Sequence, residues 1–282
     1  MNRPTAGPEI PVTRIPEDGG WHCSHLYYSF NRARLAAMSS EQIAAGRAAV
    51  IAALDPSAEA APTRLQTSIV SGHKADFGVM MLDPDPLVLD SVHQRLMASP
   101  LGPALDLGYS FVSITEISEY VLTPEQFGER LVAEGADPAS EEYAMKVKGY
   151  EARLGGMNRQ RLTPEFPKYT NMCFYPMNKI RDPHANWFTL PKAERMRMMS
   201  EHARSGIAFA GKVSQLITVG VGLEDWEWGV TLWAANPQYL KEIVYAMRFD
   251  EASAKYAEFG PFLTSYVCAA HQMLDHCRVG AG

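Results

Sequence analysis

The chain has 282 residues, of which 26 are Lys or Arg and 32 are Asp or Glu, so its formal charge is −6. The hydrophobic fraction of 46% and the charged fraction of 21% are ordinary for a globular protein. They exclude disorder, collagen and a coiled coil as the main state. The acidic balance argues against a dedicated nucleic-acid-binding protein, and no apolar run approaches the roughly 18–20 residues of a membrane-spanning helix.

The first 20 residues contain four prolines and no apolar block. We therefore expect residues 1–20 to form a flexible arm rather than a secretory signal. The four cysteines are widely spaced and form no CxxC pair, which predicts free thiols in a reducing cytoplasm. They are Cys23, Cys173, Cys268 and Cys277.

Two parts of the chain resemble each other. The segment YSFNRAR at 28–34 aligns with YPMNKIR at 175–181. In each half a helix-like stretch, a strand-like run and a second amphipathic segment follow in the same order. These segments are 38–54, 72–82 and 86–99 in the first half and 190–206, 224–234 and 237–250 in the second. The sequence therefore contains two copies of one α+β unit.

The repeat predicts an α+β fold in which two ferredoxin-like repeats form a dimeric α+β barrel-type unit with antiparallel sheets and outer helices. We expect the first repeat at 21–123 and the second at 166–282. Residues 124–165 are richer in charged and polar groups and are predicted to be a connector, with some helix near 124–134. Two facing four-stranded sheets would enclose an apolar pocket, which is a usual place for a ligand.

The second repeat carries an unusual strand. Residues two apart share a face of a strand, so a strand at 173–180 would direct Tyr175, Met177 and Lys179 to one side. One interpretation places Tyr175 and Met177 in the core, with Lys179 extending to solvent at the end of the sheet. The other places a phenol, a thioether and an ammonium on the wall of a functional site.

The following helix is predicted to begin near Pro191 and to end near Gly206. Met199, His202, Ala203 and Gly206 then share one face, which makes His202 part of the apolar side. A histidine there is often a hydrogen-bonded core residue. A single histidine among methionines and aromatics is also a pattern that holds the iron of a haem, so both interpretations stay open.

Other motifs are weaker. The groups His22-Cys23-Ser24-His25 and His271, His276 and Cys277 bring possible metal ligands together, but neither has the paired spacing of a structural zinc site. Gly220-Val-Gly222 lacks a third glycine, which favours a turn over a nucleotide-binding loop. The sequence has no GxSxG motif and no P-loop.

Several blocks of the second half, in order, resemble the haem-dependent coproheme decarboxylases of the chlorite dismutase-like superfamily. The blocks are FYPMNKIR, WFTLPKAERMRMMSEH, GKVSQLIT, GLEDWEWGVTLW and MRFDEASAKYAEFGPF. The resemblance is dense over 165–265. It is fainter in the first half, where GWHCSHLYYSF, GHKADFGVMML and SEY fit the same pattern.

The resemblance implies roles for individual residues. Tyr175 matches the tyrosine that the family uses as a radical to oxidise propionates, and Lys179 matches a lysine that assists at a propionate. His202 matches the proximal iron ligand, and Gln215 stands where one branch of these decarboxylases has Gln and chlorite dismutases have Arg. The other implied cofactor-binding positions are Arg161, Met177, Trp187, Arg248 and Ser253.

The implied reaction converts two propionates of iron coproporphyrin III (coproheme) to vinyl groups with hydrogen peroxide, which yields haem b. Coproheme would be both substrate and redox centre, a ferrochelatase would deliver it, and the family suggests a ring of five subunits. The neutral amide of Gln215 is a poorer partner for an anionic oxychlorine ligand than a guanidinium, so chlorite dismutation is the second enzymatic reading. A peroxidase-like enzyme, a non-catalytic haem carrier or sensor, and a structural repeat without ligand are the remaining alternatives.

Overall fold

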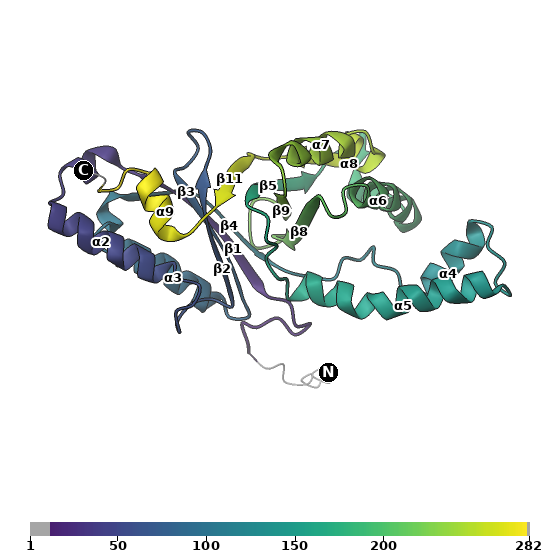
Figure 1. The fold of residues 1–282 in the computed structure, drawn as a ribbon. Helices are drawn as coiled ribbons and strands as arrows, with labels where there is room; N and C mark the ends of the chain where they lie inside the picture. Colours follow the sequence, from purple (N-terminus) through teal and green to yellow (C-terminus); the bar gives the residue numbers. More distant parts are fainter. Residues whose placement is uncertain (1–11, 281–282) are drawn as a thin grey trace, which may run out of the picture.

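The computed structural model describes residues 12–280, so residues 1–11 of the predicted N-terminal arm lie outside the described part. Within it, nine strands form one antiparallel sheet in the order β10-β5-β11-β2-β3-β1-β4-β8-β9, and β5 also pairs with β9. This extra pairing closes the sheet into a barrel, which lies between two groups of helices (Figure 1). The predicted α+β class with outer helices is confirmed.

The strands of the first half are β1 (His22–Phe30), β2 (Arg64–Val70), β3 (Phe77–Asp83) and β4 (Leu105–Ile114). Those of the second half are β5 (Asn171–Lys179), β8 (Val213–Val219), β9 (Trp228–Ala234), β10 (Ala257–Phe259) and β11 (Leu263–Val267). A short hairpin of β6 (Arg181–Asp182) and β7 (Ala185–Asn186) follows β5.

Both halves have the same strand arrangement. The first is ordered β4-β1-β3-β2, and the second is ordered β11-β5-β9-β8, with β10 beside the far end of β5. The halves join where β11 pairs with β2 over three residue pairs and where Ile114 of β4 pairs with Val219 of β8. The repeat seen in the sequence is therefore a repeat of topology.

The helices of the first half are α1 (Arg32–Ala36), α2 (Ser40–Ala53) and α3 (Pro86–Ala98), with a 3₁₀ turn at Gly102–Ala104. The second half has a 3₁₀ turn at Trp187–Thr189, α6 (Lys192–Ile207), α7 (Pro237–Met247), α8 (Glu251–Tyr256) and α9 (Ala270–His276). The helices α3 and α7 begin alike. The side chains of Asp85 and Asn236 each cap a helix whose first residue is a proline, a position where the missing N–H costs nothing.

Side chains fill the interior of the barrel. Tyr27, Phe111 and Phe174 come from three different strands and pack together, because alternate residues of a strand point inward. His25 stacks on Phe174 with 4.1 Å between ring centroids, and its Nε2 is 2.8 Å from Thr231 Oγ1. Burial lowers the pKa of His25 to about 3, so this imidazole is neutral.

The expectation that the two sheets enclose a ligand pocket is therefore wrong. A barrel of about eight strands has an interior just wide enough for its own side chains. Cys23 lies buried in the same interior, whereas the Nε2 of His22 contacts the carbonyl oxygen of Arg14. No group of three or more His, Cys, Asp or Glu suited to a metal ion occurs among residues 12–280.

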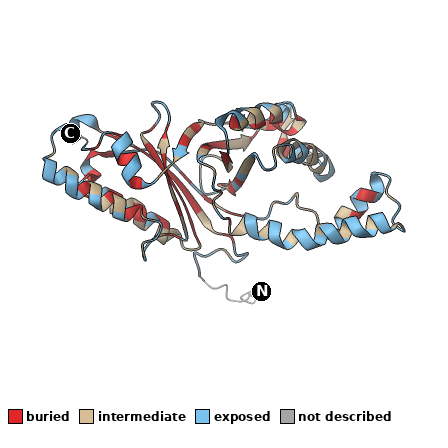
Figure 2. Ribbon diagram, in the orientation of Figure 1, coloured by how far each residue is buried: buried red, intermediate tan, exposed pale blue. Residues whose placement is uncertain are grey.

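Two helices occupy the predicted connector, α4 (Pro124–Ala133) and α5 (Glu141–Leu162). The first matches the helix expected near 124–134, and the second was not predicted. Phe127 stacks on Tyr150 at 4.3 Å, and Gly128 lets the ring of Tyr143 approach closely, so the two helices pack mainly on each other. They form an arm that projects from the barrel, with exposed residues along α5 (Figures 1 and 2). None of the described helices is long and apolar enough to cross a membrane.

Candidate active site

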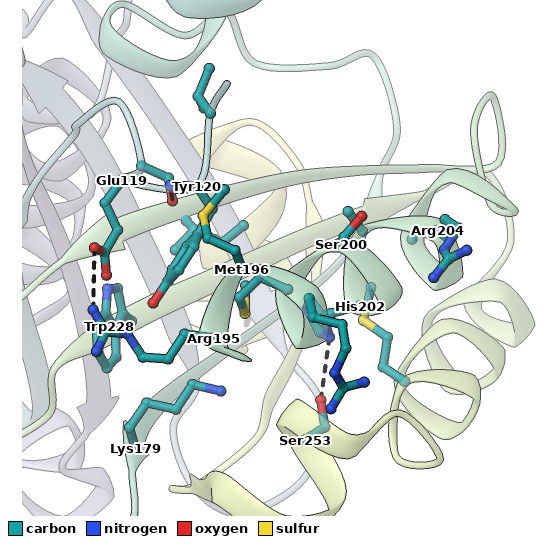
Figure 3. A pocket seen from close by; sticks show the side chains of 18 of the residues that line it. Glu119, Tyr120, Lys179, Arg195, Met196, Ser200, His202, Arg204, Trp228 and Ser253 are labelled. Carbon is teal, nitrogen blue, oxygen red and sulfur yellow. Dashed lines mark hydrogen bonds and ion pairs between the residues drawn. The ribbon is translucent and has the colours of Figure 1, made fainter. Parts of the chain in front are cut away.

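A cavity of about 980 Å³ lies against the outer face of the second half of the barrel. Its walls are formed by the outward side chains of β5, β8 and β9 and by helices α6 and α7 (Figure 3). Residues of the loop after β4 and of α4 complete the rim. This volume is at the upper end of the range for small-molecule sites.

The nine residues to which the resemblance assigns a role all line this one cavity. They are Arg161, Tyr175, Met177, Lys179, Trp187, His202, Gln215, Arg248 and Ser253. They come from a connector helix, two strands, a 3₁₀ turn, α6 and the segment around α8. The chain therefore brings together residues that are up to 92 positions apart, from 161 to 253.

Strand β5 directs Tyr175, Met177 and Lys179 to the cavity, as its alternation predicts. The ring of Tyr175 stacks on Phe262 at 4.4 Å and meets Phe259 edge-on at 5.8 Å. Burial raises the pKa of Tyr175 well above its usual value. The phenol therefore keeps its hydrogen at any physiological pH.

Tyr175 and Met177 pack in a hydrophobic cluster, as the first interpretation predicts, but Lys179 does not extend to solvent, so that part of the interpretation is wrong. The residue is 9% exposed, its Nζ donates a hydrogen bond of 3.1 Å to the carbonyl oxygen of Ala252, and Nζ lies 4.2 Å from the ring centroid of Trp187. Burial lowers the pKa of Lys179 to about 8, against the opposing attraction of Asp250 and Glu227. The ammonium is thus held in an apolar wall with donor capacity to spare.

Helix α6 runs from Lys192 to Ile207, within one residue of the predicted limits. Its residues Met199, His202, Ala203 and Gly206 all line the cavity, as their spacing predicts. The Nδ1 atom of His202 lies 2.9 Å from Asp250 Oδ2 and 3.3 Å from Ser253 Oγ, the latter drawn in Figure 3. The structure thus confirms that His202 is hydrogen-bonded and shows that it faces the cavity, whereas its role as an iron ligand stays a prediction.

Asp250 fixes the ring of His202. Its side chain is 1% exposed and also caps α8, where Oδ1 accepts a hydrogen bond from the backbone N–H of Ser253. Burial alone would raise the pKa of Asp250, but the contacts from His202 and Ser253 outweigh it and lower the pKa. A carboxylate at Nδ1 selects the tautomer with a hydrogen on that atom, which leaves a lone pair on Nε2.

The site fits an iron porphyrin that carries carboxylates. Among the described residues no hydrogen-bond partner is found for His202 Nε2, the atom that an iron would need. The walls combine Met177, Trp228 and Val230 with guanidinium groups that would pair with carboxylates. Arg248 lies over the ring of Phe259 at 5.3 Å, and Arg161 is held by Asn158 at 3.2 Å.

Helix α6 lies close to the side chains of β8 and α7 at Gly206. A Cβ atom at Gly206 would lie 3.1 Å from Met247 Cε and 3.3 Å from Gln215 Nε2. Gln215 itself is an outward residue of β8, directed to the cavity. Trp187 is buried between Lys179 and Tyr256, whose ring centroid is 5.5 Å away.

The residues of the site that were not identified from the sequence include Glu119, Tyr120, Arg195 and Asp250. Asp250 precedes Ser253 by three residues, which is the pattern of a helix N-cap and predicts a helix start there. Its contact with His202 spans 48 residues of sequence and no local spacing predicts it.

Known proteins are similar to this chain in sequence and in fold. A protein-family model described as chlorite dismutase matches residues 40–268. The chain is 38% identical over 210 residues to a coproheme decarboxylase from Oceanobacillus iheyensis, which covers 74% of this chain and 75% of the relative. The solved structure of a heme-binding protein from Thermus thermophilus is 32% identical, with a TM-score of 0.74 over 92% of this chain and 95% of that one.

Chlorite dismutase from Candidatus Nitrospira defluvii is 15% identical, with a TM-score of 0.67 over 94% of this chain and 96% of that one, and so shares the fold. The family match covers both halves of the barrel, and the sequence identity extends over most of the chain. The chain therefore belongs to the chlorite dismutase family.

Proposed function

We propose that the protein binds iron coproporphyrin III and uses hydrogen peroxide to convert two of its propionates to vinyl groups, which yields haem b. One observation carries this proposal: Tyr175 and Lys179 face the same cavity as a histidine whose Nε2 is available. A haem carrier would need only the histidine and the pocket. The relative named coproheme decarboxylase supports the same assignment.

Binding would rest on the groups that line the cavity. His202 would hold the iron through Nε2, and the Asp250 carboxylate would keep its ring oriented. Lys179, Arg161 and Arg248 would pair with propionates through charge-assisted hydrogen bonds. The acidic net charge of the chain is no obstacle, because these cations act locally at short range.

The bound iron porphyrin supplies the oxidising chemistry with peroxide. Each propionate loses its carboxyl group as carbon dioxide and one hydrogen from its β-carbon, and this two-electron oxidation is balanced by reduction of one peroxide to two waters. Tyr175 is neutral and carries the hydrogen that it would give up, and the resulting phenoxyl would take the hydrogen from the β-carbon. Lys179 would hold the carboxylate beside Tyr175 until carbon dioxide leaves.

The test is to mix the protein with ferric coproporphyrin III, titrate hydrogen peroxide and follow the porphyrin mass by chromatography. We expect the loss of two carboxyl groups. The variant Tyr175→Phe should be slower by about a hundredfold or more, because no O–H hydrogen remains at that position. Tyr28→Phe is the matched control, since Tyr28 is the aligned tyrosine of the first half and lies outside the cavity.

Two results would contradict the proposal. Unchanged porphyrin mass after peroxide would exclude the reaction, and equal rates for Tyr175→Phe and the wild type would exclude the radical role. Rapid oxygen evolution from chlorite would instead favour chlorite dismutation, the reaction that the neutral side chain of Gln215 disfavours.

A further inference from the structure

Arg195 lies on the same face of α6 as His202 and lines the same cavity. The two residues are seven positions apart, which is two helical turns and about 10 Å along the axis. That length is comparable to the distance from the centre of a porphyrin to the carboxylates on its rim. A ligand centred on His202 would therefore bring its rim close to Arg195.

The guanidinium of Arg195 is held in place from one side. Its NH1 donates a hydrogen bond of 2.9 Å to the carbonyl oxygen of Leu190, just before the start of the helix. The side chain is 18% exposed, so most of it is fixed by its surroundings. A guanidinium has five N–H donors, and this backbone contact uses one of them.

The ion pair of Arg195 is loose. Its NH2 lies 3.7 Å from Glu119 Oε2, whereas a charge-assisted hydrogen bond is about 2.7–2.9 Å long. Glu119 belongs to the loop after β4, and Figure 3 shows its carboxylate joined to Arg195. Its side chain is 51% exposed. An ion pair that is long and half exposed contributes little to stability, so its loss costs little.

Tyr120 connects this ion pair to the reactive wall of the cavity. Its ring meets Trp187 nearly edge-on, with 6.5 Å between the centroids, and Trp187 in turn contacts Lys179. Burial raises the pKa of Tyr120, a hydrogen bond to Glu119 raises it further, and Arg195 acts against both. The three side chains of Glu119, Tyr120 and Arg195 thus form one polar cluster in the cavity.

We propose that Arg195 binds a carboxylate of the tetrapyrrole, and that Glu119 occupies Arg195 until this carboxylate replaces it. The inference rests on the proposed function, because it takes a porphyrin with carboxylates on its rim as the ligand. Glu119 is then a built-in competitor, and the exchange favours ligands that bring a carboxylate of their own to this end of the cavity.

The experiment titrates each protein with metal-free coproporphyrin III and follows the porphyrin fluorescence, so that the carboxylates are tested without the bond between iron and His202. We expect Arg195→Gln to weaken binding about tenfold, as for the loss of a hydrogen bond to a charged group. Glu119→Gln should tighten binding about two- to fivefold, because the competitor loses its charge. In the double variant the affinity should equal that of Arg195→Gln alone.

Lys192→Gln is the matched control, since it removes a positive charge from the first turn of α6 outside the cavity. It should leave the affinity unchanged. Arg195→Lys keeps the charge without the fork of donors and should lose only part of the affinity, which keeps the test valid if Arg195→Gln folds poorly.

The inference is wrong if Arg195→Gln and Lys192→Gln bind the porphyrin equally well. It is also wrong if Glu119→Gln weakens binding, because Glu119 would then support the site rather than compete for it. These outcomes leave the proposed function intact as long as the wild type decarboxylates coproheme. A wild type that binds coproporphyrin without decarboxylating coproheme would contradict the proposed function. The binding titrations of the Arg195 variants would then still test the role of Arg195.

Discussion

The two halves of the barrel share a strand order but differ in what lies between the sheet and the helices. In the first half, α9 returns from the end of the chain and packs on β2 and α2, where Met273 and Leu274 are fully buried. Among the described residues no helix takes the corresponding place between α6 and β8, and the candidate active site lies there. The same space between sheet and helices is thus filled by core side chains in the first half and is the candidate site in the second.

The aligned strands show the difference residue by residue. Tyr28 stacks on Phe77 at 5.0 Å and its hydroxyl lies 2.9 Å from His93 Nδ1, whereas Tyr175 lines the cavity. Arg32, which aligns with Lys179, forms an ion pair of 2.9 Å with Asp76. In the first half, the reactive groups are satisfied by the protein itself. In the second, their counterparts remain available to a ligand.

The largest effect is expected from the residue that would hold the iron, His202 of α6. His202→Ala should lower the affinity for ferric coproporphyrin III about a hundredfold or more and change its visible spectrum, because the nitrogen ligand is lost. An absorption titration measures both. His93→Ala, the histidine beside Tyr28, should leave the spectrum unchanged. An unaltered iron spectrum in His202→Ala would show that another residue holds the metal.

Truncating a core side chain in the first half of the barrel should lower the stability of the protein and leave its activity unchanged. Leu274→Ala removes a fully buried side chain of α9 and should lower the free energy of unfolding by about 2–5 kcal/mol. Urea denaturation measures the change, and Leu87→Ala, an exposed residue of α3, is the control. If both variants lose the same small amount, α9 does not support the core of the first half.

The contact between Asp250 and His202 is expected to strengthen the binding of an iron porphyrin. Asp250→Asn keeps the shape but removes the charge that orients the imidazole, so we expect iron coproporphyrin to bind about 10- to 100-fold more weakly. The affinity of metal-free coproporphyrin should change much less, because that ligand forms no bond with His202. Equal losses for both porphyrins would mean that Asp250 acts on the fold and not on the ligand.

The smallest effect concerns protonation of Lys179. Its pKa of about 8 means that the ammonium loses its proton as the pH rises from 7 to 9. We expect the affinity for metal-free coproporphyrin to fall by up to about tenfold over this range, since the pairing with a carboxylate needs the charge. The decline should be absent in Lys179→Met and present in Lys255→Met, which changes an exposed lysine of α8. A decline that persists in Lys179→Met would assign the titration to another group.

The features that depend on local spacing could be predicted from the sequence alone. Alternation along β5 put Tyr175, Met177 and Lys179 on one face, and the helical period put His202 beside Met199 and Gly206. The order of segments revealed the repeat, and the resemblance identified Gln215 and Arg248, which also line the cavity. A short-range period is enough for these features because backbone geometry fixes it.

The position of the cavity and the residues that complete it depend instead on how distant segments pack together. Both faces of the sheet carry apolar residues, so the sequence could not distinguish the packed interior of the barrel from the open outer face. None of the residues of helix α5 is fully buried, because side chains such as Tyr150 pack mainly against α4 and not against the barrel. Asp250 meets His202, and Glu119 meets Arg195, across distances in sequence that no period describes. Such contacts follow from how the closed sheet and its helices pack.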